Sequence, residues 1–233
     1  MTVKYKGIKI AVLLVLFCAT TIQAQKYSIE AGYISPTRTQ SIYGGRYPET
    51  FRGVRLGGNV EFDYKYNFSL LTGVLYSVVY SNSTQKMKIA GNNTDTIHTG
   101  IVKYSTFGHY VDVPVRVKYT LSIAKNLKLF AFAGPNINVG LGQPRKTDAS
   151  LQESVTGIID QLTGRVPVSG NDDLFRDALI HRINFQLGAG GGVQWKNYTI
   201  KGGYDFGINN LQRLDNAGSM RMNSWYVSFV YNF

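Results

Sequence analysis

Cysteine, histidine, acidic residues and long apolar runs are all scarce in this sequence of 233 residues. The one cysteine, Cys18, lies in a segment that we expect to be removed, so the mature chain has neither a disulfide framework nor thiol chemistry. After residue 24 no apolar stretch reaches the roughly 20 residues of a membrane helix. What remains is a chain rich in tyrosine (16) and glycine (25), which suits a membrane β-barrel with aromatic girdles.

The first 24 residues are predicted to be a secretory signal peptide. Lys4, Lys6 and Lys9 form a basic start, residues 10–19 are apolar, and Ala24 precedes the expected cut. A membrane anchor is an alternative, but the apolar run is short for one. A lipoprotein cut at Cys18 is another, although bulky Phe17 stands where a small residue is expected. Cleavage removes three lysines and lowers the formal charge from +11 to +8. Residues 25–233 form the predicted mature domain.

The stretch 225–233 alternates between apolar and more polar positions. Trp225, Phe229 and Phe233 share one face with Val227 and Tyr231, whereas the opposite face is more polar. This period of two predicts a strand with one apolar face. The final aromatic resembles the C-terminal signal that the barrel-assembly machinery reads in bacterial outer-membrane barrels. That resemblance assigns the signal to Trp225, Phe229, Tyr231 and Phe233.

The same alternation recurs along the mature chain and predicts eight strands. They cover 26–35, 52–66, 68–82, 107–121, 127–141, 182–195, 198–208 and 225–233. Pro114 interrupts one of them and predicts a bulge or local break. Three connections are short, near Asn67, at 122–126 and at Lys196-Asn197. Four are long, at 36–51, 83–106, 142–181 and 209–223. This rhythm is typical of an outer-membrane barrel, which has short periplasmic turns and long outer loops.

The predicted fold is therefore all-β: an eight-stranded antiparallel transmembrane barrel with long extracellular loops. A soluble lipocalin-like barrel or a sandwich is the alternative, and it would bury the apolar face inside. The signal peptide, the aromatic end and the loop rhythm favour an apolar face that meets lipid in the bacterial outer membrane.

Several segments resemble a known family. Residues 110–119 (YVDVPVRVKY) resemble the L-x-I-P-L-x-x-K-Y strand of the PorT-like outer-membrane barrels of Bacteroidetes, and 130–135 (FAFAGP) the strand that follows it. Residues 186–192 (QLGAGGG) and 203–208 (GYDFGI) resemble two later strands of that family. The resemblance implies an eight-stranded barrel related to the OmpA and OmpX barrels. It also implies, as one possibility among several, an accessory role in a type IX protein secretion system.

The polar face of the strands carries charged residues that should point into the barrel. Five acids stand against seven bases, of which Lys65 and Lys128 fall near the periplasmic rim. Buried charge is costly unless paired, so we expect a network that plugs the lumen rather than a proton or ion path. Its predicted members are Glu30, Arg55, Glu61, Asp63, Asp112, Arg116, Lys118, Arg182, Lys201 and Asp205.

The sequence gives little support for an enzyme. A serine hydrolase needs a histidine within hydrogen-bond reach of the serine, and the His-x-Ser spacing of outer-membrane deacylases is absent at His109 and His181. Three scattered histidines, including His98, also make a poor metal site. We therefore expect no catalytic residues, no cofactor, no metal and no nucleic-acid partner. A narrow channel and a lipid-modifying enzyme are the weaker alternatives.

The outer loops are the remaining place for function. In the third loop, Ser150 and Glu153 form a capping box before an apolar stripe at helical spacing, and a second short helix should begin at Asp172 or Asp173. Basic loop residues should meet outer-membrane lipid and lipopolysaccharide by charge. They are Arg38, Arg46, Arg52, Lys86, Lys88, Lys103, Arg145 and Lys146. The sequence thus predicts a non-enzymatic structural or interaction barrel, with envelope secretion proteins as further candidate partners.

Overall fold

The computed structural model describes residues 25–42, 45–90, 97–150, 170–175, 180–213 and 218–233. The predicted signal peptide and the first predicted helix of the third loop lie outside these ranges. Among the described residues, no helix has the length and apolar character needed to cross a membrane.

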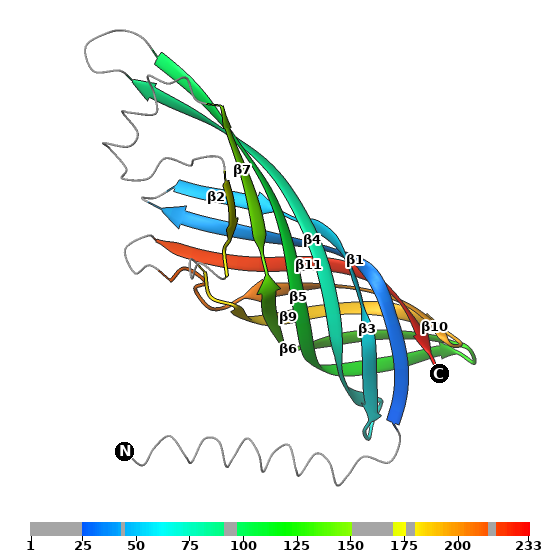
Figure 1. The fold of residues 1–233 in the computed structure, drawn as a ribbon. Helices are drawn as coiled ribbons and strands as arrows, with labels where there is room; N and C mark the ends of the chain where they lie inside the picture. The colour runs from blue at the N-terminus through cyan, green and yellow to red at the C-terminus, as the bar shows by residue number, and fades with distance from the viewer. Residues whose placement is uncertain (1–24, 43–44, 91–96, 151–169, 176–179, 214–217) are drawn as a thin grey trace, which may run out of the picture.

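Eight long strands form a closed ring (Figure 1). They are β1 (Gln25–Ile42), β3 (Arg52–Asp63), β4 (Phe68–Ala90), β5 (Ile97–Ala124), β6 (Leu127–Gly142), β9 (Ile183–Trp195), β10 (Tyr198–Gly207) and β11 (Ser219–Asn232). Each pairs antiparallel with its neighbours in the ring, and β11 closes the ring by pairing with β1, as at Ala31 opposite Phe229. The predicted eight-stranded antiparallel barrel is confirmed.

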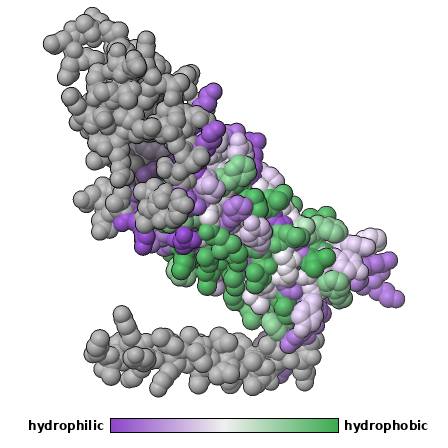
Figure 2. Space-filling view, viewed as in Figure 1, coloured by the Kyte–Doolittle hydropathy of each residue, from purple (hydrophilic) through white to green (hydrophobic). Residues whose placement is uncertain are grey.

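The apolar face of each strand lies on the outside of the ring. In β9, Ile183, Phe185 and Leu187 are about half exposed, whereas Asn184 and Gln186 between them are buried in the lumen. A soluble barrel would show the opposite arrangement. Figure 2 shows apolar side chains gathered on the barrel wall, with hydrophilic residues toward its ends. The outer wall therefore suits lipid rather than water.

Aromatic pairs on neighbouring strands mark the two edges of this apolar wall. Phe68 packs against Tyr119 with ring centroids 5.0 Å apart, and Tyr80 packs against Phe107 at 4.7 Å. Phe68 and Tyr80 lie on the same strand, β4, and the twelve steps between them span about 28 Å of membrane height at a tilt of about 45°. That height matches the apolar band of roughly 25 Å in outer-membrane barrels.

The three short connections lie together at one end of the barrel. In the β3–β4 turn, Tyr66 and Asn67 have φ values of 60° and 65°, and Lys196 in the β9–β10 turn has φ 51°. Such left-handed conformations form the tight turns of two-stranded hairpins. Phe233 donates its N–H to the Tyr27 carbonyl at 3.0 Å, so the C-terminus and the start of β1 lie at this same end. By the general architecture of these barrels, it is the periplasmic end.

The opposite end contains more β-structure than the sequence predicted. Strands β4 and β5 continue as a hairpin to Ala90 and Ile97, and β11 begins at Ser219. Three short strands add to this end: β2 (Gly45–Thr50) on β1, β7 (Pro144–Ser150) on β5, and β8 (Gly170–Asp173) on β7. The predicted loops were too long because these segments lack the outward-facing apolar positions of a membrane strand, as at Ser219, Arg221 and Asn223 of β11.

Two local predictions had different outcomes. The β4–β5 ladder skips the positions of Val113 and Pro114, which is the local break predicted from that proline. The predicted second helix of the third loop is wrong at its start, because Asp172 and Asp173 belong to β8. Residues 176–179 of that segment lie outside the described residues.

The glycine cluster of β9 makes room for aromatic rings inside the barrel. A Cβ atom at Gly192 would collide with the Ile200 carbonyl oxygen and lie 2.6 Å from Cζ of Phe130. Phe130 and Phe132 stack with ring centroids 6.2 Å apart in this space.

We expect Gly192→Ala to destabilise the barrel by about 1–3 kcal/mol through overpacking, measured by urea unfolding in detergent. Gly202→Ala is the matched control, since its nearest neighbour would be at 3.4 Å. Equal effects of both variants would contradict the overpacking argument.

Candidate functional site: the lumen and its two mouths

The centre of the lumen is organised around the buried carboxylate of Glu30 on β1. Arg55 of β3 donates to it through Nε at 2.9 Å, and Asn59 of the same strand through Nδ2 at 2.9 Å. Lys201 of β10 reaches it with Nζ at 2.7 Å. The Arg55 guanidinium also lies 3.8 Å from the centroid of the Tyr226 ring. Two cations and one anion from three strands are therefore held together in the core of the barrel.

A second pair crosses the lumen beside this cluster. Arg116 of β5 forms an ion pair with Asp205 of β10, and both side chains are buried. Asp112, also on β5, accepts hydrogen bonds from Nδ2 of Asn136 and of Asn138, each at 2.9 Å. The cavity left among these groups is only about 10 Å³, the size needed for a single water molecule. The lumen is thus filled by side chains at this level, as expected for a barrel of eight strands.

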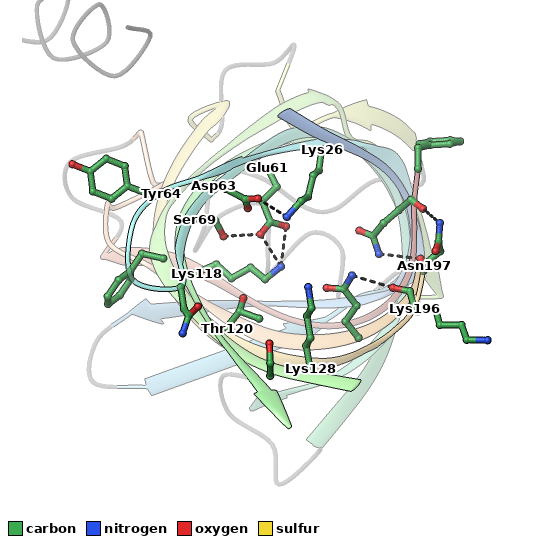
Figure 3. Close-up of a pocket in the computed structure, with 16 residues that line it drawn as sticks. Lys26, Glu61, Asp63, Tyr64, Ser69, Lys118, Thr120, Lys128, Lys196 and Asn197 are labelled. Atoms are coloured by element: carbon green, nitrogen blue, oxygen red, sulfur yellow. Dashed lines mark hydrogen bonds and ion pairs between the residues drawn. The ribbon is translucent and has the colours of Figure 1, made fainter. Parts of the chain in front are cut away.

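The periplasmic mouth is an open vestibule of about 420 Å³ (Figure 3). Glu61 lies at its inner end and accepts from Lys118 Nζ at 2.8 Å and from Ser69 Oγ at 2.6 Å. Lys26 and Asp63 form a partly exposed ion pair at 2.5 Å. Lys128 also points into this space in Figure 3. The Lys26–Asp63 pair is therefore accessible to water, whereas Lys118 is buried like the charges around Glu30.

A cluster of apolar side chains packs at the outer mouth of the barrel. Phe175 packs edge-on against Tyr110 with ring centroids 6.0 Å apart. Arg38 lies beside this cluster and is paired with Glu49 at 2.5 Å and with Gln143 Oε1 at 3.0 Å. The buried apolar residues that accompany Phe175 are Leu174, Ile180, Leu211, Met220 and Met222. This layer narrows the outer mouth, where a pocket of about 230 Å³ remains beside Arg38, Glu49 and Arg145.

The structure brings together most of the residues predicted for the lumen network and separates one. Arg182 is exposed at the outer end of β9, where its Nη1 donates to the Leu141 carbonyl at 3.0 Å. Arg38, expected among the lipid-facing loop residues, is instead 5% exposed and belongs to the lumen. The inward position of Arg38 was not predicted, because no sequence signal indicated the β1–β2 hairpin that sets Arg38 opposite Glu49. Arg46, Arg52 and Lys103 are exposed, whereas the side chains of Lys86 and Lys88 are not described.

The residues predicted as the C-terminal assembly signal point outward. Trp225, Phe229 and Phe233 are 44%, 50% and 73% exposed, and Trp225 packs against Tyr33 with ring centroids 5.3 Å apart. Tyr231 packs between Tyr198 and Phe233 near the periplasmic edge. Their position suits a lipid-facing girdle. Their role as an assembly signal stays a prediction.

The two histidines whose side chains are described, His109 and His181, take no part in the lumen network. His109 lies on the outer wall, where its Nδ1 is 2.7 Å from the Tyr76 hydroxyl, and His181 is exposed at the outer rim. The side chain of His98 is not described. Within the described part of the chain, no group of three or more His, Cys, Asp or Glu residues is placed to hold a metal ion.

A closed ring of eight strands with a charged, filled lumen and an apolar belt outside defines a transmembrane β-barrel of the outer-membrane type. Residues 23–213 match the family described as outer membrane protein beta-barrel domain. The chain belongs to this family, which places it in the bacterial outer membrane.

Solved structures similar to this chain include three outer-membrane proteins, each at low identity. Ail of Yersinia pestis is 16% identical over 91% of this chain and 100% of its own, with a TM-score of 0.35. Neisserial surface protein A is 10% identical over 91% and 100%, with a TM-score of 0.39. The protease OmpT from Escherichia coli is 10% identical over 91% and 98%, with a TM-score of 0.43. A comparison with curated proteins gives no match.

Proposed function

We propose that this protein is a non-enzymatic interaction barrel whose working surface is a β-sheet on the outer side of the membrane. The observation that carries the proposal is the continuation of β4 and β5 beyond the Tyr80–Phe107 girdle. Their ladder runs from Ser81 opposite Thr106 to Ala90 opposite Ile97, about 30 Å along the strand. Strands β7 and β8 widen it to four strands (Figure 1).

The filled lumen supports a role outside the barrel rather than through it. The central cavity of about 10 Å³ and the apolar layer around Phe175 leave little room for a solute. A narrow channel is accordingly the weaker alternative. The extension adds strands beyond the membrane belt, and segments outside the conserved wall of a fold are where binding residues are commonly found. His109 is directed away from the lumen, because its Nδ1 lies 2.7 Å from the Tyr76 hydroxyl on the outer wall.

An accessory role in protein secretion is the second candidate, and it rests on the resemblance to PorT-like barrels. The resembling segments 110–119 and 130–135 lie on the adjacent strands β5 and β6, which pair at Lys118 and Phe132. These segments supply Asp112, Arg116 and Lys118 to the lumen. The resembling segments therefore belong to the barrel wall and the lumen. A partner in secretion has to be identified by experiment.

Shortening the β4–β5 hairpin tests the proposed working surface. We expect a chain in which residues 83–104 are replaced by Asn-Gly to assemble normally, because the cut lies outside the girdle and Asn-Gly favours a tight hairpin turn. In-cell crosslinking of tagged copies, followed by mass spectrometry, should recover its outer partners about tenfold less than the parent chain, the scale of losing one hot-spot contact.

The matched control shortens the β1–β2 hairpin by replacing residues 41–46 with Asn-Gly and should keep those partners. Unchanged recovery from the shortened β4–β5 chain would refute the proposal. Recovery of secretion-system components by the parent chain would favour the second candidate.

A further inference from the structure

A crevice at the outer rim of the barrel joins basic side chains to the lipid-facing wall. Its volume is about 450 Å³, and it lies where β9 begins and where the chain leaves β10. Because β9 ends in the periplasmic turn at Lys196, its start lies at the outer edge of the membrane. The crevice is separate from the lumen network around Glu30 and from the sheet extension of β4 and β5.

The upper part of the crevice is positively charged. Arg182, Arg213 and His181 line it, and no carboxylate is present among the described residues that do so. Arg182 is held in place by the Leu141 carbonyl at 3.0 Å and by the Phe175 ring, whose centroid is 5.6 Å from its guanidinium. In the described part of the chain, neither the Arg213 guanidinium nor the His181 ring has a hydrogen-bond or ionic partner. These groups are available to an anion.

The lower part of the crevice is apolar and continues the outer wall. Ile183 and Phe185 line it and are 46% and 50% exposed. Phe206 of β10 and Ile208, just after it, are also exposed on this wall, and the Ile208 N–H donates to the Phe185 carbonyl at 2.8 Å. A ligand of this crevice would therefore meet positive charge at one end and hydrocarbon-facing side chains at the other.

We propose that this crevice binds the phosphate group of a phosphorylated outer-leaflet glycolipid. Arg182 and Arg213 would contact the phosphate, since a guanidinium matches phosphate geometry with paired donors. The acyl chains would lie along Ile183 and Phe185. Because the crevice lies at the outer rim, its ligand would come from the outer leaflet. A basic loop attracts any anion, whereas this crevice also offers apolar side chains to an acyl chain.

Retention of lipid by the purified, folded mature barrel tests this site. Native mass spectrometry would compare bisphosphorylated lipid A, dephosphorylated lipid A and phosphatidylglycerol as probes. We expect preferential retention of bisphosphorylated lipid A. Arg182→Gln with Arg213→Gln should lower that retention about tenfold, on the scale of losing charged hydrogen bonds. Arg182→Lys with Arg213→Lys should give an intermediate retention, because the charge remains but the paired donors of the guanidinium are lost.

The matched control is Arg52→Gln with Lys103→Gln, which removes two exposed charges elsewhere on the outer rim and should leave retention nearly unchanged. Equal losses from both glutamine pairs would overturn the site in favour of nonspecific charge attraction. Equal retention of dephosphorylated lipid A would overturn the phosphate contact. Equal retention of phosphatidylglycerol would overturn the assignment to an outer-leaflet glycolipid. Heat-dependent gel migration reports whether each variant is folded.

Discussion

Replacing Glu30 by alanine is expected to lower the free energy of unfolding of the barrel by about 3–5 kcal/mol. Glu30 is 1% exposed and is the shared partner of Arg55 and Lys201. Its removal leaves two cations in the filled centre of the lumen without their carboxylate. An uncompensated buried charge is among the most costly single changes in a folded protein. Urea unfolding of the barrel in lipid vesicles, followed by tryptophan fluorescence, measures the effect.

Two further variants separate the buried charge from charge in general. Lys26→Ala breaks the ion pair with Asp63, whose side chains are 50% and 38% exposed, and should cost no more than about 1 kcal/mol. Replacing Glu30, Arg55 and Lys201 together by methionine removes the whole group and should restore much of the stability lost in Glu30→Ala. A loss below about 1 kcal/mol in Glu30→Ala would show that the cluster is hydrated and not a plug.

Replacing Val74 by arginine is expected to destabilise the membrane-inserted barrel by about 2–4 kcal/mol. Val74 is 59% exposed on the outer wall and lies midway along β4 between the girdle residues Phe68 and Tyr80. An arginine there would enter the centre of the hydrocarbon layer, where a charge cannot keep its hydration. The measurement is again urea unfolding in lipid vesicles.

The control for Val74 is an equally exposed position at the edge of the belt. Ile123 is 59% exposed and lies beyond the Phe68–Tyr119 girdle, near the β5–β6 turn. Ile123→Arg should cost only about 0–1 kcal/mol, because its charge reaches the interface. Similar costs at the two positions would contradict the height and placement of the lipid belt.

Much of the barrel wall could be predicted from sequence because membrane strands carry a strong local signal. Alternation placed Glu30, Arg55 and Lys201 on inward faces and Ile29, Leu56 and Ile200 on outward ones, as the structure has them. The outer ends could not be predicted in the same way. Past Ser35 and Asn82 both faces of the strands are polar, and hydrogen bonds between hairpin arms rather than an apolar face define the strand.

The basic residues of the outer end show the same limit. Arg38 and Arg182 have similar settings in the sequence, each next to the end of an alternating stretch. The β1–β2 hairpin turns Arg38 inward to Glu49, whereas Arg182 stays on the rim beside Phe175. Outside a regular alternation, the direction of a side chain depends on its tertiary neighbours. The sequence pattern therefore predicted Arg38 outside and Arg182 in the lumen, and the structure has the reverse.

By itself the sequence determined the class of fold, the number of membrane strands and the face of each strand that meets lipid. These follow from a period of two, which is a property of neighbouring residues and needs no knowledge of the rest of the chain. Only the tertiary structure decided which charges pair across the lumen, which side chains pack at the outer mouth, and where Arg182 and Arg213 meet the lipid-facing wall. The physical reason is that ring closure fixes the register of all eight strands at once, and this register brings Glu30 to Lys201 and Arg116 to Asp205.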